Sequence, residues 1–566
     1  MLNKAAEKTA SQLILIGAPL ATVFLVTDSV TDPVNATKLA VAGGLAFGLL
    51  SVTLLANFRF LLSQSKTFLV FAGLFTLASM NAVINSNSPL SQNVYGSFGR
   101  NTGLITYLVL LAIAVSALAL HEISSFKKVI YGLQIAGIIN VLYCAWVVAF
   151  GDFLSWNNPY GNILGLFGNP NFISAFLGIF ITTVMAYVVA PDTSIKIRII
   201  GTLISLLAFY EVVDSNAIQG IVVTLGGLAL IGFFLVRSFL KSAVFTSIYV
   251  FLVLGVGSLA VLGALQKGPF TFIYKTSVSL RGAYWNAGIT MGMDHPLTGV
   301  GMDSYGDWYR RARSENAATV LPGPNTITNA AHNVVLDFFA YGGFPLLISY
   351  LGMLLLAGIA AIKVIRRQKS YDAIFVAMFG AWTCYQVQSL ISINQVGLAL
   401  WGWILTGALI AYERATRGLL EGTEPSKKLG SKPNLKKSES VFSPQLIAGL
   451  GIVLGLIIAV PPLSADASWR SALDSKDASK VIATLESGYL NPSDSQRYAQ
   501  AVQLFATSNL LEQAHAIALK ATVFNPDHFD SWRNLYFLSN STEEEKALAL
   551  KNLKRLDPLN PDVTSR

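Results

Sequence analysis

The chain has 566 residues, of which 53% are hydrophobic and only 13% are charged, and its formal net charge at pH 7 is +9. An average soluble domain has roughly 25% charged residues, so the composition excludes an ordinary water-soluble globular protein and indicates a membrane protein. The two cysteines, Cys144 and Cys384, lie inside apolar runs, which argues against a disulfide framework or a metal site.

Apolar runs recur along most of the chain, and a helix of about 20 such residues crosses the ~30 Å hydrocarbon core of a bilayer. The first run is long and lacks a small-residue cleavage site, so we expect a retained helix and not a signal peptide. We predict an all-α, polytopic membrane bundle of about thirteen spans. The clearest runs are 11–30, 39–58, 104–120, 129–150, 172–190, 218–236 and 446–461, and weaker or shorter ones lie near 67–85, 197–213, 243–265, 335–362, 373–392 and 396–412.

The distribution of Lys and Arg predicts the orientation, because positively charged short loops stay in the cytoplasm. If the N-terminus is cytoplasmic, every second gap between spans is basic, beginning with Arg59 and Lys66. The net charge is therefore explained by topology, and no nucleic-acid partner is predicted, since that would require a clustered basic patch. The opposite gaps, which contain no Lys or Arg, are 31–37, 151–171, 213–217 and 393–396.

Four parts follow one another along the chain. We expect a transmembrane body over 1–413 with a large non-cytoplasmic loop at 266–333, a basic cytoplasmic linker over 414–443, a last transmembrane helix over 444–463, and a non-cytoplasmic tail over 464–566.

The tail contains a repeated proline signal. Asn-Pro pairs begin at residues 491 and 525, which are 34 residues apart, and a D-P-L-N-P segment begins at Asp557, 32 residues after the second pair. A period near 34 is typical of tetratricopeptide repeats, and an unrelated helical hairpin domain is the alternative. In either case the tail offers a docking surface for a protein partner.

His332 differs from the other four histidines because it lies where the large loop re-enters the membrane. An ionisable residue at the edge of an apolar span is costly to keep and therefore indicates function, although a histidine can also simply anchor a helix at the interface. A neutral imidazole, with an ordinary pKa of about 6.5, can accept a proton from a hydroxyl group.

Two arginines on the predicted non-cytoplasmic side are candidate anion ligands. Arg281 begins an amphipathic segment of the large loop, and a guanidinium group binds a pyrophosphate by parallel hydrogen bonds. The alternative is a surface arginine held by lipid headgroups. Arg100, at the start of the fourth predicted span, is either a second cation or a side chain that extends to the interface.

Polar segments interrupt several spans, namely G-N-P-N at 168–171, S-N-A-I-Q-G at 215–220 and a glutamine- and serine-rich stretch at 386–395. Hydrogen bonding between helices is the ordinary explanation, and a sugar-binding cavity open to the non-cytoplasmic side is the alternative. The sequence has no P-loop, no dinucleotide fingerprint and no metal-ligand cluster, so no cofactor, nucleotide or metal is predicted.

Four motifs stand close together in the membrane body: R-G-A-Y-W-N-A-G from Arg281, D-H-P-L-T-G-V-G-M-D-S-Y from Asp294, A-H-N-V-V-L around His332, and Y-G-G-F about ten residues later. Weaker support comes from F-G-N-P-N-F-I-S-A-F-L-G and Q-V-Q-S-L-I-S-I-N-Q. In these residues the chain resembles the bacterial O-antigen ligase and O-antigen polymerase superfamily, in the branch with a tetratricopeptide tail. The resemblance covers about 90–415.

The resemblance implies a GT-C-like fold in the bacterial cytoplasmic (inner) membrane and a metal-independent inverting transferase. Such an enzyme moves a glycan from undecaprenyl pyrophosphate to the hydroxyl of a glycan, lipid or protein acceptor on the outer face. It implies His332 as the base and Arg281 as the pyrophosphate ligand. Ligases often have a second Arg where this chain has Gln219, and Arg100 is a candidate replacement. The residues assigned to substrate binding are Arg100, Asn333, Gln219 and Asp303.

Two other classes of protein compete with a transferase. A transporter or flippase of lipid-linked glycan also needs many spans and buried polar groups, but transporters commonly contain two matching inverted halves, and none is visible here. A membrane scaffold could recruit envelope enzymes through the repeat tail, although about thirteen spans are many for an anchor.

Overall fold

The computed structural model describes residues 3–420 and 443–565, and this part of the chain contains helices, loops and one isolated β-bridge between Gly488 and Asn491. The prediction of an all-α protein is therefore confirmed for these residues. Most of the predicted basic linker at 414–443 lies outside them. The apolar helices of the body are α1 (Lys4–Val23), α2 (Asn35–Gln64), α3 (Lys66–Ile84), α5 (Leu104–Ala117), α6 (Ile123–Phe150), α7 (Pro170–Val188), α8 (Ile195–Asp214), α9 (Ile218–Leu240), α10 (Ala243–Ala264), α14 (Val334–Arg367), α15 (Ala373–Ser389), α16 (Val396–Leu420) and α17 (Pro444–Ala459).

The described residues contain eight helices long and apolar enough to cross a membrane, and the bent pair of α17 and α18 (Pro461–Ser475) makes a ninth candidate. The protein is therefore a multi-pass membrane protein, but thirteen spans are not shown. The other four predicted runs do form helices. However, α5 and α15 have only 14 and 17 residues, and α1 and α8 carry charged side chains near their ends. The predicted last span at 444–463 ends early, because the chain bends by 49° between α17 and α18.

The centre and the edge of the bundle differ in burial. Trp401 of α16 is fully buried, and its Nε1 donates a hydrogen bond of 2.9 Å to Thr22 Oγ1 on α1. At the edge, Phe251 and Leu254 of α10 are 76% and 64% exposed. Apolar surface of this extent is unfavourable in water and stable against lipid, which agrees with a helix that faces the bilayer.

The long helix α14 breaks inside the Y-G-G-F segment, where Gly343 has a φ of +61°. The Tyr341 carbonyl, freed by this break, accepts a hydrogen bond of 3.1 Å from the Gly301 backbone N–H. Gly299 also has a φ of +61°, and a Cβ there would lie 2.2 Å from the Tyr341 carbonyl carbon. The T-G-V-G and Y-G-G-F segments are thus one unit that ties the large loop to α14.

The segment between α10 and α14, predicted as a polar loop, is largely helical. It contains a short 3-10 turn, η2 (Thr271–Ile273), followed by α11 (Thr276–Asp294), α12 (Tyr305–Ala312) and α13 (Glu315–Thr319). The amphipathic segment predicted to begin at Arg281 starts within α11 and continues past the end of this helix at Asp294. The remaining short elements of the body are α4 (Leu90–Tyr95) and the 3-10 turn η1 (Gly165–Phe167).

The tail consists of helix pairs with their own apolar core, in which Trp469, Phe505 and Leu553 are buried. The first helices of the three pairs begin at residues 461, 495 and 529, so successive pairs start 34 residues apart. This spacing supports the tetratricopeptide interpretation, which stays a prediction. After α18 come α19 (Ala478–Thr484), α20 (Ser495–Thr507), α21 (Leu511–Phe524), α22 (Phe529–Phe537), α23 (Glu543–Leu556) and α24 (Pro561–Thr564).

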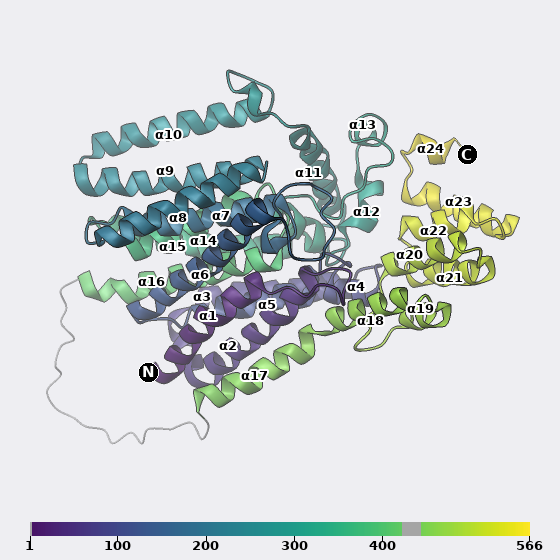
Figure 1. The fold of residues 1–566 in the computed structure, drawn as a ribbon, viewed down its shortest axis with the longest axis horizontal. Helices are drawn as coiled ribbons and strands as arrows, with labels where there is room; N and C mark the ends of the chain where they lie inside the picture. The colour runs from purple at the N-terminus through teal and green to yellow at the C-terminus, as the bar shows by residue number, and fades with distance from the viewer. Residues whose placement is uncertain (1–2, 421–442, 566) are drawn as a thin grey trace.

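The helices α11 to α13 lie at one end of the bundle, with the tail helices beside them (Figure 1). The junction between α9 and α10 lies at the opposite end. The large-loop segment and the tail therefore share one end of the molecule, which is also where the candidate site is found.

Candidate active site

A cavity of about 710 Å³ opens at this end of the bundle. Four of the six predicted site residues line it: Arg100, Gln219, Arg281 and His332. They come from the loop before α5, the start of α9, α11 and the turn before α14, so segments far apart in the sequence meet here. The two other predicted residues, Asp303 and Asn333, are not among its lining side chains.

His332 lies in a tight turn with a left-handed φ of +55°. The turn is fixed from both sides. Asn333 is the N-cap of α14, and its Oδ1 accepts hydrogen bonds from the Val335 and Leu336 backbone N–H groups at 3.0 and 3.2 Å. The Asp337 carboxylate accepts one from the Ala331 N–H at 2.7 Å. Asn333, which was predicted to bind substrate, therefore supports His332 and is not among the residues that line the cavity.

The surroundings of His332 keep its imidazole neutral. Burial lowers its pKa to about 3, and the positive charges of Arg100 and Arg281 lower it further in the same direction. A neutral imidazole has a free nitrogen lone pair and can accept a proton. Both arginines line the same cavity as His332.

The helix α11 presents one face to the cavity. Ser277, Leu280, Arg281 and Tyr284, which line the cavity, have the i, i+3, i+4, i+7 spacing of a single helix face. The Tyr284 ring stacks on the His332 ring with a centroid distance of 5.6 Å. Burial lowers the pKa of Arg281, but an arginine stays charged at any physiological pH. The cavity wall therefore carries a fixed positive charge next to a neutral imidazole.

Asp303 holds the loop that carries Arg100. Its buried carboxylate accepts hydrogen bonds from the Ser97 and Thr102 backbone N–H groups at 2.7 and 3.4 Å. Gly96, with a φ of +87°, is required here because a Cβ would lie 2.6 Å from Asp303 Oδ2. Burial raises the pKa of Asp303 to about 6, against the opposing effects of the Ser97 N–H and the Arg100 charge. Asp303, which was predicted to bind substrate, thus supports the loop that carries Arg100 and is not among the residues that line the cavity.

The floor of the cavity is rich in amide groups. Gln219 Nε2 donates a hydrogen bond of 2.7 Å to Gln388 Oε1, and Asn394 Oδ1 accepts one of 2.8 Å from the Tyr385 hydroxyl. Among the described residues, Gln219 Oε1 and Gln395 Nε2 are buried without a protein partner. Buried polar atoms of this kind normally have a partner, so a polar ligand would satisfy them.

Another part of the cavity lining comes from the segment 151–171, which contains no Lys or Arg and ends in the polar G-N-P-N motif. Trp156, Asn157, Tyr160 and Asn169 lie between α6 and α7, and Asn169 Nδ2 donates a hydrogen bond of 3.1 Å to the Tyr160 hydroxyl. Aromatic rings and amides are a suitable lining for a sugar. Asn169 was noted in the sequence as part of the G-N-P-N motif, whereas no sequence pattern marked Trp156 and Tyr160.

Residues 203–351 match the protein-family model described as O-Antigen ligase. A search of curated proteins gave no match. The matched segment runs from α8 into α14 and contains Gln219, Arg281 and His332, whereas Arg100 lies outside it. The chain is therefore a multi-pass membrane protein with an O-antigen ligase domain, and that domain supplies three of the four predicted residues in the cavity.

Proposed function

We propose that the protein transfers a glycan from undecaprenyl pyrophosphate to an acceptor hydroxyl on the outer face of the cytoplasmic membrane. One observation carries this proposal: the cavity combines a neutral imidazole, His332, with the guanidinium groups of Arg100 and Arg281, whose charges act on it. The tail adds a third cavity-lining guanidinium group, that of Arg470. The match of residues 203–351 to the O-Antigen ligase model supports the same reaction class.

The two arginines suit a lipid-linked pyrophosphate. Each guanidinium can form parallel hydrogen bonds to phosphate oxygens, and together they would stabilise the charge that grows on the pyrophosphate as it leaves. In other transferases a divalent cation stabilises the charge of the leaving group. Here the two guanidinium groups would supply this positive charge, so no metal is required in the proposed mechanism. Arg100 fits the role of the second family arginine, whose place in the sequence is taken by Gln219.

His332 acts as the base in a single displacement. The acceptor oxygen forms a bond to the anomeric carbon, and the bond from that carbon to the pyrophosphate oxygen breaks, with its electron pair leaving on the pyrophosphate. His332 takes the hydroxyl proton. A pKa of about 3 makes a weak base. The bound pyrophosphate would offset the charges of Arg100 and Arg281, so the pKa rises when the donor is present.

The amide-rich floor and the part of the lining from 151–171 would hold the sugars. Gln219 and Gln395 have buried atoms free to pair with sugar hydroxyls or N-acetyl groups. Trp156 and Tyr160 offer apolar faces to a sugar ring. The acceptor can be a glycan, a lipid or a protein, and this choice separates a ligase from a polymerase.

The distribution of charge supports an outer location for the cavity. Segments from three of the gaps without Lys or Arg, at 31–37, 151–171 and 393–396, line it. The basic pair Arg237 and Lys241 lies at the α9–α10 junction, at the opposite end of the bundle (Figure 1). With the positive-inside rule, the cavity and the tail are non-cytoplasmic and the N-terminus is cytoplasmic.

The test is reconstitution of the purified protein with undecaprenyl-pyrophosphate glycan and candidate acceptors. Wild type should transfer glycan, and His332→Ala should lose at least about 100-fold in rate, as expected for loss of a general base. His295→Ala is the matched control, because His295 lies in the same loop but does not line the cavity. Transfer to a foreign acceptor indicates a ligase, and a longer lipid-linked chain indicates a polymerase. Full activity of His332→Ala contradicts the mechanism, and movement of the glycan across the bilayer without transfer favours a transporter.

A further inference from the structure

The tail contacts the loop that carries Arg100. The Asp494 carboxylate accepts a hydrogen bond of 3.1 Å from the Phe98 backbone N–H, two residues before Arg100. The same carboxylate is the N-cap of α20, where it accepts a hydrogen bond of 2.8 Å from the Gln496 N–H. The Arg497 guanidinium lies 5.2 Å from the centroid of the Phe98 ring. Two tail residues therefore contact one residue of this loop.

The loop contains a turn in which the Ser97 carbonyl accepts hydrogen bonds of 3.0 Å from the Arg100 and Asn101 backbone N–H groups, and three outside groups hold this turn in place. Asp303 holds the Ser97 N–H at 2.7 Å, and Asn35 Nδ2 donates a hydrogen bond of 2.8 Å to the Gly99 carbonyl. Asp494 holds the Phe98 N–H that lies between them. Consecutive backbone groups from Ser97 to Gly99 are thus fixed by α2, by the large loop and by the tail. Arg100 follows directly, so its direction into the cavity depends on all three.

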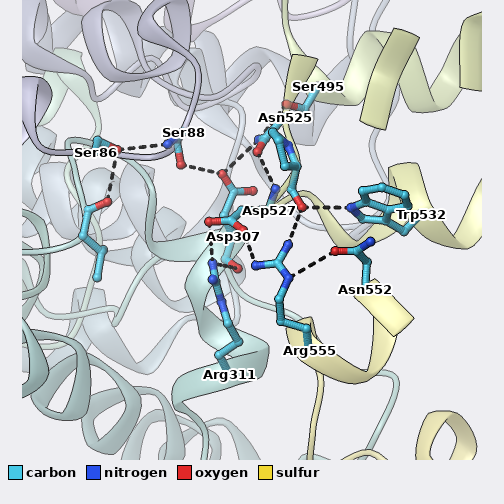
Figure 2. Close-up of polar contacts among 12 residues, drawn as sticks. Ser86, Ser88, Asp307, Arg311, Ser495, Asn525, Asp527, Trp532, Asn552 and Arg555 are labelled. Atoms are coloured by element: carbon cyan, nitrogen blue, oxygen red, sulfur yellow. Dashed lines mark hydrogen bonds and ion pairs between the residues drawn. The ribbon is translucent and has the colours of Figure 1, made fainter. Parts of the chain in front are cut away.

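The tail is itself fixed to the body, which allows it to hold the loop in one position. Figure 2 shows one group of these contacts, in which the Asp527 carboxylate lies between Arg311 and Arg555, at 3.2 and 2.7 Å. In the same view, Asn525 Nδ2 donates a hydrogen bond of 3.2 Å to Asp307 Oδ2 on α12.

Two further contacts fix the tail at other points. The fully buried Asp557 carboxylate pairs with Arg310 and Arg313 at 2.8 and 2.7 Å. At the first tail helix, α18, Asp466 accepts a hydrogen bond of 2.8 Å from the Asp32 backbone N–H, and Asp32 lines the cavity. The tail therefore meets the body at α12, at the loop before α2 and at the Arg100 loop.

We propose that the tail is part of the active unit and that Asp494 and Arg497 are positioning residues, which set Arg100 to receive the pyrophosphate of the donor. This inference rests on the proposed function, since it assumes that Arg100 is an anion ligand. In this role the tail acts on the cavity of its own chain, in addition to offering a docking surface for a partner protein.

The test measures binding of undecaprenyl pyrophosphate to the full chain in detergent, together with thermal unfolding. Asp494→Ala should weaken binding about tenfold, the effect of losing one charge-assisted hydrogen bond that holds a ligand-binding group. Asp477→Ala is the matched control, because Asp477 also caps a tail helix, with 2.9 Å to the Ser479 N–H, but has no hydrogen bond to the body among the described residues. It should bind like wild type. Asp494→Asn keeps an acceptor oxygen and should recover most of the affinity. If the alanine variant fails to fold, Arg497→Ala replaces it, because this variant loses the contact with the Phe98 ring but keeps the Asp494 N-cap, and it should also weaken binding.

A double substitution separates positioning from general loss of stability. If Asp494 acts through Arg100, Asp494→Ala should cause no further loss of affinity in an Arg100→Ala background. Two results would overturn the positioning role of Asp494 but leave Arg100 as an anion ligand. The first is additive losses of affinity in the double variant. The second is weak binding by Arg100→Ala together with equal binding by Asp494→Ala and Asp477→Ala. Wild-type affinity of Arg100→Ala itself would overturn the assignment of Arg100, and with it both the proposed function at this residue and the inference.

Discussion

The rings of His332 and Tyr284 stack with planes 29° apart, and they join the turn before α14 to the cavity face of α11. A stacked aromatic pair contributes about 0.5–1.5 kcal/mol beyond burial of its area. Tyr284→Ala should therefore lower kcat about threefold to tenfold, through a less well fixed imidazole. Tyr284→Phe keeps the ring and should stay close to wild type in the same transfer assay. Equal loss in both variants would point to the hydroxyl group instead of the stack.

The pH dependence of folding should report the buried imidazole. The pKa of His332 is about 3 in the folded state and about 6.5 when unfolded, so the unfolded state binds the additional proton between these values. Stability is therefore lost as the pH falls from about 6.5 towards 3, and is fully present above 6.5. His332→Gln should remove this part of the acid sensitivity, measured as the denaturant midpoint at pH 7 and pH 5. An unchanged slope in that variant would mean that other groups cause it.

Binding of the donor should raise the pKa of His332. The positive charges of Arg100 and Arg281 contribute to the low pKa of His332, and bound pyrophosphate offsets them. Arg281→Gln should likewise raise the pKa of His332. Imidazole NMR resonances of His332, titrated with and without undecaprenyl pyrophosphate, measure both effects. A pKa that does not respond to the lipid would indicate that the pyrophosphate binds elsewhere.

The geometry of the anion ligand should matter as well as its charge. Arg281→Lys keeps one positive charge but loses the planar fork that binds two phosphate oxygens, so kcat/KM should fall about tenfold. Lys275→Arg provides a control for general changes in this region, because Lys275 directly precedes α11 and donates a hydrogen bond of 2.8 Å to the Asn216 carbonyl outside the cavity. Full activity of Arg281→Lys would reduce the role of Arg281 to a point charge.

The contact of the T-G-V-G segment with α14 should be intolerant of any side chain. Gly299→Ala places a Cβ against the Tyr341 carbonyl in a left-handed backbone, which should cost about 2–4 kcal/mol of stability. Gly358 lies farther along α14, and a Cβ there meets no atom within 4 Å, so Gly358→Ala should be neutral or slightly stabilising. Thermal unfolding in detergent distinguishes the two variants.

Removal of the buried carboxylate should detach the tail. Asp557→Ala leaves Arg310 and Arg313 without their shared carboxylate, and such a change typically costs about 3–5 kcal/mol. The exposed pair Arg470–Asp474 is a suitable control, because Asp474→Ala should cost less than about 1 kcal/mol. Hydrogen exchange of the tail helices measures both. Unchanged protection in Asp557→Ala would show that the other contacts suffice.

Much of the fold followed from hydrophobicity, because a bilayer selects apolar helices and each of the thirteen predicted runs forms a helix. The number of complete spans did not follow from hydrophobicity alone. A span must be both long and nearly free of charge, whereas α5 is short and α1 and α8 have charged ends. The helical character of the large-loop segment was also incompletely predicted. The helix α12 is polar, and it is held by Asp527 and Asp557, more than 200 residues away in the sequence.

The site was predictable where chemistry limits the choice of residue. A histidine and an arginine beside a membrane face are costly and few, which is why His332 and Arg281 could be selected. Tyr284 could not, because an aromatic residue in a helix normally signals packing. Asp303 was predicted to bind substrate, and only the fold shows that its carboxylate accepts hydrogen bonds from the Ser97 and Thr102 N–H groups. No local pattern marks Asp494 as a partner of Phe98.

The contact between Asp494 and Phe98 has a consequence for biosynthesis. Ribosomes make Phe98 and Arg100 long before Asp494, and the apolar helices from α5 to α17 are made in between. During this interval the Phe98 N–H lacks its carboxylate partner. The Arg100 loop therefore reaches its final form only after α17 has been inserted and α20 has folded on the same side of the membrane. Translation that stops before residue 494 should give an inserted chain whose Arg100 loop lacks the contact with Asp494.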